Sequence, residues 1–285
     1  MTQSIKPTLP CAELPDYFFW PINNRNYISN IPIESSESCT DLTGQQGLAD
    51  GSGKSDTFIY KAGHWCLKTS IRNHFNSIQN GQEALVKLSK KKTILGHLLP
   101  PQTLLVLQPE NEKSCWLWTI TPWYKTLRSL MVEAVENNNE PVLAVALQAF
   151  ARVAIEALIL TSQQNLSLDI HPSNFALPNY LPGIKINPLN YEMVVYLDDD
   201  MVETPDCLTV GYALLKRIDE YEKWPKAIEI YFLTLEDAIS TKISQVDIKK
   251  LHLLEAFQDI PLRTALAQNF TKHIISIIKQ CQDTI

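Results

Sequence analysis

The chain of 285 residues is long enough to bury a full hydrophobic core, as one large domain or two smaller ones. Hydrophobic residues make up 45% of it and charged residues 20%, which excludes a wholly disordered chain and a collagen-like one. Asp and Glu total 31 against 25 Lys and Arg, and the resulting net charge of -6 disfavours general binding to nucleic acid or to an anionic membrane surface. Only 9 residues are glycine, so a site that needs a glycine-rich loop has few to draw on.

The cysteines and the apolar segments bear on the compartment. Six cysteines are scattered, with no C-x-x-C pair and no cluster with histidine, which argues against a zinc site and a disulfide framework. The N-terminal segment has no apolar core of signal-peptide length. The most apolar helix candidate, Pro141 to Leu160, contains Gln148, Arg152 and Glu156, so we expect a buried helix rather than a membrane span. We therefore expect a cytoplasmic protein without membrane insertion.

The first part of the chain has the pattern of loops and strands. Residues 1–44 are rich in Pro, Ser, Asn and Thr, and we expect them to form an arm that its aromatic cluster, residues 17–20, packs onto the body. The aromatic and β-branched runs 57–60 and 64–68, split by Lys61-Ala62-Gly63, predict a hairpin. The elements expected next are a helix over 77–91 and strands over 102–107 and 114–121.

The rest of the chain has mainly helical spacing. A short helix is predicted over 127–135, and a long one over 141–164 begins with proline, as helices often do. Two brief apolar runs follow, at 175–177 and 193–197, and the tail from Leu208 onward predicts about four helices. Because strands gather first and helices later, without β-α-β alternation, the pattern is typical of an α+β fold. The expected division is the arm 1–44, a β-rich domain 45–121 and a helical domain 122–285.

A possible phosphate-binding loop lies in Gly51-Ser52-Gly53-Lys54-Ser55. A Walker A loop needs a glycine five residues before Gly53, and that position is Leu48. Such a loop also leads into a helix, whereas a strand-like segment, T-F-I-Y, follows here. We therefore do not expect a Walker A loop. The alternatives left open are a turn between two strands whose amides approach phosphates, and a flexible surface linker.

The segment L-S-L-D-I-H-P-S-N-F-A-L, residues 166–177, carries the strongest pattern. An acidic residue, Asp169, comes just after the long helix, and Asn174 follows five positions later. Two short apolar runs come next, and the second ends in three consecutive Asp residues, 198–200. This D-x-H-P-x-N pattern resembles the protein-kinase-like superfamily. It is most similar to the branch of aminoglycoside and choline phosphotransferases and the atypical kinases of ubiquinone biosynthesis.

The resemblance implies a two-lobed kinase-like fold and a phosphotransferase that uses ATP and Mg²⁺. It implies that Asp169 orients or deprotonates an acceptor hydroxyl, that Asn174 holds Mg²⁺, and that Asp198 holds Mg²⁺ bridging the ATP phosphates. These roles suit the residue types, because Mg²⁺ binds one or two carboxylates together with substrate phosphates. The resemblance implies a small-molecule acceptor without identifying it, and His171 is expected to be structural.

The same resemblance assigns residues in the β-rich domain. Lys68, at the end of a predicted strand, would contact the phosphates, and Glu83 in the following helix would hold Lys68. Thr121 and Trp123 would belong to a hinge whose backbone meets the adenine ring. Gly51 and Gly53 would cover the phosphates.

Other interpretations compete with this one. The D-I-H-P-S-N segment can be an Asx-type turn after a helix, the Asp run a solvated turn, and Glu83 one half of a surface pair with Lys87. At the level of function, the rival is a kinase-fold binding or regulatory protein without phosphotransfer, which the scarce glycine and Ser167, where the family often has His, both favour. An α+β protein with coincidental motifs is the third alternative.

Overall fold

The structure, a computed structural model, describes residues 6–10, 18–19, 39–43, 56–178, 194–199, 201–202, 208–242, 244, 253–258 and 264–283. The chain divides into two compact units, residues 1–124 and 125–285. Strands dominate the first unit and helices the second, so the mixed α and β composition expected from the sequence is confirmed. Gly51, Gly53 and most of the expected arm 1–44 lie outside the described residues.

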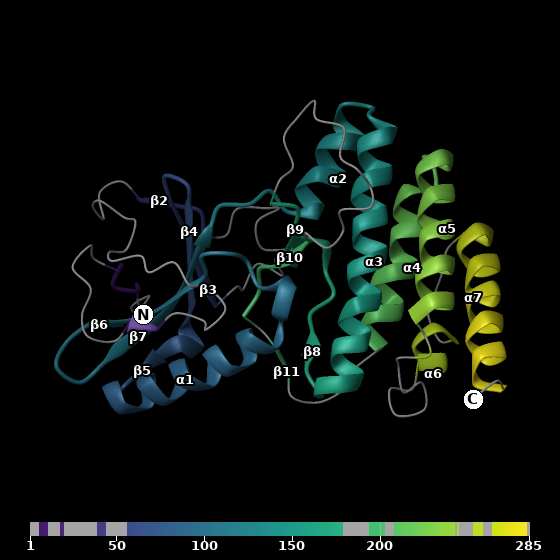
Figure 1. The fold of residues 1–285 in the computed structure, drawn as a ribbon. Helices are drawn as coiled ribbons and strands as arrows, with labels where there is room; N and C mark the ends of the chain where they lie inside the picture. The colour runs from purple at the N-terminus through teal and green to yellow at the C-terminus, as the bar shows by residue number, and fades with distance from the viewer. Residues whose placement is uncertain are drawn as a thin grey trace, which may run out of the picture. The chain divides into compact units, whose positions relative to one another are not determined.

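In the described part of the first unit, seven strands form one antiparallel sheet in the order β1-β6-β7-β4-β3-β2, and β5 pairs with the start of β7 (Figure 1). The predicted hairpin is present, and its turn contains Gly63 in the left-handed region at φ +57°. The strands are β1 (Phe18–Phe19), β2 (Cys39–Asp41), β3 (Thr57–Ala62), β4 (Trp65–Ser70), β5 (His74–Phe75), β6 (Leu104–Pro109) and β7 (Cys115–Pro122).

The two faces of this sheet bury different clusters, because successive side chains of a strand point to opposite faces. One cluster is built on Trp116 and Trp118 of β7, both fully buried. The other contains Leu105, Leu107, Cys115 and Leu117 and is covered by helix α1 (Ile78–Ile94), which contributes Leu85 (Figure 1). Each side of the sheet therefore has its own hydrophobic core.

Gly81 sets how closely α1 approaches the sheet. A Cβ atom at this position would lie 2.5 Å from Sγ of Cys115 and 2.7 Å from Cδ1 of Leu107. Both distances are shorter than van der Waals contact, so a residue larger than glycine would require a shift of these two side chains or of the helix. Ser77 caps the helix by accepting a hydrogen bond from the backbone N–H of Asn80. The cap and the glycine together determine which side of α1 faces the sheet.

The second unit is built mainly from helices, and α3, α4, α5 and α7 pack alongside one another (Figure 1). The predicted helices 127–135 and 141–164 correspond to α2 and α3, and the described tail contains four helices. A short 3-10 helix, η4, follows α3 in the chain. The bounds are α2 (Leu127–Glu136), α3 (Glu140–Gln164), η4 (Pro172–Asn174), α4 (Leu208–Tyr221), α5 (Pro225–Lys242), α6 (Leu253–Gln258) and α7 (Ala265–Asp283).

Helix α3 is the central apolar element of this unit. Among the described residues it is the one helix long and apolar enough to cross a membrane by length and composition. Its most apolar window is 67% buried inside the protein, as in the core helix of a soluble protein. Asn139 caps its start by accepting a hydrogen bond from Val142 N–H, and Asn165 ends it in the left-handed conformation, at φ +52°.

After α3, the described part of the second unit contains two separate two-stranded antiparallel sheets. In one, β8 (Ser167–Leu168) pairs with β11 (Met201–Val202), and in the other, β9 (Phe175–Ala176) pairs with β10 (Val195–Tyr196). The strands are nested in the chain, since β9 and β10 both lie between β8 and β11. This nesting brings the segments that leave β8 and β10 into one region.

Candidate functional site

Two short segments of the second unit connect the two small sheets. Residues 169–174 lead from β8 to β9, and residues 197–200, of which Asp200 lies outside the described residues, connect β10 to β11 in the chain. Each segment is therefore held at both ends by pairing with strands that flank the other segment. The predicted candidates Asp169, Asn174 and Asp198 all belong to these two segments.

A side-chain bond joins the first and last residues of the 169–174 loop. Nδ2 of Asn174 donates to Oδ2 of Asp169 over 2.9 Å and to the backbone oxygen of Asp169 over 3.2 Å. The N–H of His171 also donates to that backbone oxygen, over 3.0 Å. Because Nδ2 of Asn174 makes both of its bonds, Oδ1 is the side-chain atom that Asn174 can offer to a cation.

The second segment is fixed to the first by a backbone bond. The N–H of Leu197 donates to the backbone oxygen of Asn174 over 2.7 Å. Asp198 follows directly, and its Oδ1 accepts a hydrogen bond from the N–H of Asp199 over 2.9 Å. The structure therefore brings Asp169, Asn174 and Asp198 together at one end of the two small sheets.

Tyr196, which no sequence pattern indicated, contacts the first residue of the 169–174 loop. Its side chain is fully buried, and its hydroxyl accepts a hydrogen bond from the backbone N–H of Asp169 over 3.1 Å. Burial raises the pKa of this hydroxyl well above its usual value of 10, and the negative charges of Asp198 and Asp169 raise it further. The hydroxyl is thus uncharged at neutral pH and lies within the field of the site's carboxylates.

The donor set fits Mg²⁺ better than a transition metal. Among the described residues, no group of three or more His, Cys, Asp or Glu side chains could hold a metal ion by itself. Mg²⁺ does not need such a cage, because it takes one or two carboxylates plus phosphate oxygens and keeps water ligands. Asp198 and Asn174 supply one carboxylate and one amide oxygen, which suits a cation that arrives with a phosphate ligand.

His171 has a local structural role in the 169–174 loop. It is the N-cap of η4, where its Nδ1 accepts a hydrogen bond from the N–H of Ser173 over 3.3 Å. The same nitrogen lies 2.7 Å from Oγ of Ser173. Through these contacts the imidazole caps η4 and stabilises the turn.

Lys68 lies in β4 on the face of the sheet that α1 covers. It is directly paired with Thr119 of β7, and Thr119 is paired with Leu105 of β6. Directly paired residues point to the same face of an antiparallel sheet, and Leu105 belongs to the cluster packed against α1. Lys68 is half-buried at this position.

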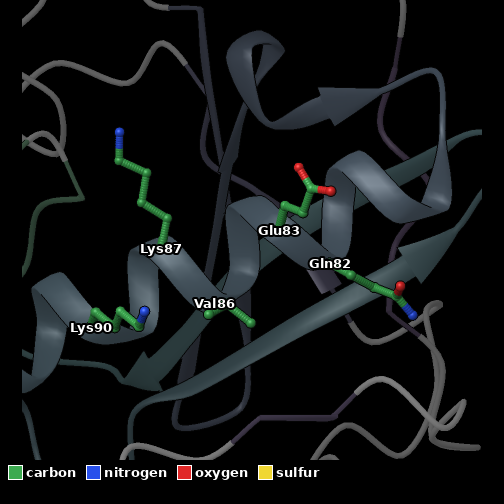
Figure 2. A pocket seen from close by; sticks show the side chains of 5 residues that line it. All are labelled: Gln82, Glu83, Val86, Lys87 and Lys90. Carbon is green, nitrogen blue, oxygen red and sulfur yellow. The ribbon is translucent and has the colours of Figure 1, made fainter.

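Glu83, the expected partner of Lys68, lies on the exposed side of α1. Its carboxylate accepts a hydrogen bond from Nε2 of Gln79 over 3.2 Å, and among the described residues it forms no ion pair with Lys68 or Lys87. The structure therefore does not bring Lys68 and Glu83 together. Figure 2 shows Glu83 at an open hollow on the outer surface of the helix, lined by Gln82, Glu83, Val86, Lys87 and Lys90.

The expected hinge residues continue the sheet. Thr121 is buried in β7 and pairs with Cys66 of β4. The N–H of Trp123 donates to the backbone oxygen of His64 over 2.6 Å, and the ammonium of Lys61 lies 4.9 Å from the centre of the Trp123 ring. The amide of Trp123 is thus already used within the first unit, and the indole is covered by a cation–π contact.

Comparison of the chain with protein-family models, with curated proteins and with solved structures finds no significant match. No family is therefore shown for the chain. The functional inference rests on the geometry of residues 169–174 and 197–199.

Proposed function

We propose that the chain is an ATP- and Mg²⁺-dependent phosphotransferase of the kinase-like superfamily that acts on a hydroxyl group, most simply of a small molecule. The observation that carries the proposal is the bonded arrangement of Asp169 and Asn174 beside Asp198. These residue types in this order are those that position an acceptor hydroxyl and hold magnesium in that superfamily. The nested pairing of four short strands supports it further, since it joins the two segments that carry them.

Each residue has a distinct task in this proposal. Asp198 and Asn174 are the residues that would hold Mg²⁺, which would neutralise charge on the phosphate oxygens. Asp169 accepts the proton of the acceptor hydroxyl as its oxygen forms a bond to the γ-phosphorus and the bond to the β-phosphate oxygen breaks, which releases ADP. Asn174 orients the Asp169 carboxylate through the 2.9 Å bond.

The proposal extends to the first unit and to the arrangement of the fold. It makes the two units the lobes of a kinase-like fold, with Lys68 contacting the nucleotide phosphates and Gly51 and Gly53 in the loop that covers them. Both glycines lie in the chain between β2 and β3, which are paired antiparallel strands. Thr121 and Trp123 would flank the adenine ring.

The proposed compartment is the cytoplasm. Cys39 and Cys115 are free thiols, and Cys115 is buried. Burial raises the pKa of the Cys115 thiol, which keeps it in the unreactive protonated form. Free thiols suit a reducing compartment.

The proposal is tested by turnover and by ligand-induced stabilisation of purified full-length protein. ATP with Mg²⁺ should raise the melting temperature in a concentration-dependent way, and ATP without Mg²⁺ should raise it less. Asp169→Asn should lower ATP turnover by roughly a hundredfold or more, the range expected for loss of a general base. The matched control is Asp237→Asn, an equal charge change at an exposed position of α5. Unchanged turnover in Asp169→Asn would contradict the assigned base.

A second function, a kinase-fold binding or regulatory protein without phosphotransfer, is favoured by the position of Glu83. An active kinase needs the Lys–Glu ion pair, and Glu83 bonds to Gln79 on the outer side of α1 instead. The same thermal-shift experiment separates the two functions. Stabilisation by ATP that is independent of Mg²⁺ and without turnover would support the binding protein.

A further inference from the structure

The Tyr196 side chain contacts the 169–174 loop and belongs to β10, the strand that leads to Asp198. Its hydroxyl accepts the backbone N–H of Asp169, and it lies two residues before Asp198 in the chain. A single buried aromatic residue therefore connects the backbone of the proposed base with the segment that carries the proposed metal ligand.

The ring of Tyr196 is held by packing that does not depend on its hydroxyl. It lies 5.2 Å from the ring of Phe175, which in turn lies 6.4 Å from the ring of Phe150 in α3. All three side chains are fully buried. Interlocked aromatic rings of this kind leave the hydroxyl little freedom to move. The hydroxyl oxygen is thus a rigid acceptor anchored to the central helix of the second unit.

The Tyr196 hydroxyl is the acceptor for the backbone N–H of Asp169. The carbonyl oxygen of Asp169 accepts bonds from His171 N–H and from Asn174 Nδ2, which both lie within the same loop and move with it. The Tyr196 hydroxyl, by contrast, belongs to β10. Loss of this bond would therefore remove the hydrogen bond that ties the backbone N–H of Asp169 itself to another strand.

We propose that Tyr196 is a positioning residue of this site, whose hydroxyl holds the backbone of Asp169 in register with Asp198. The inference rests on the proposed function for the roles of the two carboxylates. We therefore expect loss of the hydroxyl to lower turnover and metal affinity more than it lowers the stability of the fold, because the ring alone makes the packing contacts. A displacement of about 1 Å at a catalytic group can cost on the order of a hundredfold in rate.

The test compares two variants that each remove one buried tyrosine hydroxyl from the second unit. Tyr196→Phe removes the acceptor for Asp169, and Tyr231→Phe removes a hydroxyl that donates to the backbone oxygen of Leu214 over 2.9 Å. We expect similar melting temperatures for the two variants. In Tyr196→Phe, kcat should fall about 10-fold to 100-fold with little change in the KM for ATP, and in Tyr231→Phe kcat should stay unchanged.

Two readouts do not depend on turnover. Amide hydrogen exchange should become faster in peptides covering residues 167–174 in Tyr196→Phe only, because the Asp169 N–H loses its acceptor. The affinity for Mn²⁺, used as a probe for the metal site, should fall by roughly 10-fold in the same variant, as is typical when a group that orients metal ligands is removed. Asn174 connects the two effects through its bond to Asp169.

The outcomes separate this inference from the proposed function. Unchanged exchange in Tyr196→Phe, or faster exchange with unchanged kcat and Mn²⁺ affinity, would overturn the positioning role while leaving the function intact. Equal losses of kcat in Tyr196→Phe and Tyr231→Phe would also overturn it, since they would reflect general destabilisation. A wild-type protein that binds Mn²⁺ but does not turn over ATP would contradict phosphotransfer, and the role of Tyr196 would then be decided by exchange and Mn²⁺ affinity. Absence of both turnover and Mn²⁺ binding in the wild type would contradict both.

Discussion

Nδ2 of Asn174 lies 2.9 Å from Oδ2 of Asp169 and donates a hydrogen bond to it. This bond closes the loop between β8 and β9 and leaves the amide oxygen of Asn174 as the atom for a cation. One asparagine can therefore orient a carboxylate with one end of its amide and serve as a metal ligand with the other. The predictions below test this site and the packing that surrounds it.

Asp198→Asn should weaken the dependence of nucleotide binding on Mg²⁺. The carboxylate that would hold the cation becomes a neutral amide, so the extra rise in melting temperature that Mg²⁺ gives in the presence of ATP should largely disappear. Differential scanning fluorimetry across a Mg²⁺ titration measures this. Glu229→Gln on the exposed side of α5 removes one negative charge elsewhere and should behave like the wild type. A full Mg²⁺ response in Asp198→Asn would exclude the carboxylate as a ligand.

Gly81→Ala should destabilise the first unit. The new Cβ would lie 2.5 Å from Sγ of Cys115, so the Cys115 side chain or α1 itself must shift. We expect the free energy of unfolding to fall by about 1–3 kcal/mol, the range for overpacking in a core. Urea unfolding followed by tryptophan fluorescence measures the change, and Gln82→Ala at the neighbouring exposed position should have little effect.

A double variant tests whether the contact with Cys115 causes the destabilisation expected for Gly81→Ala. Cys115→Ala removes the sulfur that the new methyl group would meet. The combined loss in Gly81→Ala/Cys115→Ala should then be smaller than the sum of the two single losses, as for residues in direct contact. Additive losses would mean that Leu107 or the helix backbone causes the effect instead.

Glu220→Gln should destabilise the second unit more than Arg217→Met. The Glu220 carboxylate accepts a hydrogen bond from Arg128 of α2 and lies 2.8 Å from Nη1 of Arg217, whose side chain is 2% exposed. Removing the shared anion leaves a buried cation uncompensated, which costs about 3 kcal/mol or more, whereas replacing the buried cation by an apolar chain of similar length costs less. Chemical denaturation of the two variants gives the comparison, and an equal or reversed order would contradict the assigned charge network.

Glu110→Gln should make the stability of the first unit less sensitive to acid. Hydrogen bonds from Ser114 and His74 lower the pKa of Glu110 below its ordinary 4.5. A carboxyl group with a lowered pKa stabilises the fold above its unfolded pKa, and this contribution is lost as the pH falls through the folded pKa. Denaturation midpoints should therefore fall between neutral and acidic pH by more in the wild type than in Glu110→Gln. Parallel curves for the two proteins would contradict the contribution of Glu110.

Most elements of the fold could be predicted from the sequence because their signals are local. Each signal depends on residues that are close together in the sequence. Examples are the hairpin at Gly63, the proline near the start of α3 and the helical spacing of α1. The order of strands first and helices later was sufficient for the mixed fold class. Asp169, Asn174 and Asp198 could be named from the sequence, since their residue types and spacing are distinctive.

The side of α1 on which Glu83 lies was not evident from its sequence. Helical spacing shows which residues share a face, but the rotation of α1 against the sheet depends on the fit of Gly81 against Cys115, 34 positions later in the numbering. That packing directs Leu85 inward and Glu83 outward. The predicted partnership of Lys68 and Glu83 required a rotation that only tertiary contacts determine.

The sequence contains few glycines, and one of them, Gly81, is needed for the packing of α1 against the sheet rather than for a phosphate loop. The sequence by itself determined the elements, their order and the identity of the three candidate site residues. Tertiary structure decided that Asn174 bonds to Asp169 and that the Tyr196 hydroxyl holds the Asp169 amide. The first bond depends on the conformation of the 169–174 loop, which residue types alone do not determine. The second depends on the pairing of short strands that are far apart in the chain, and strand register is not encoded by the local periodicity of either partner.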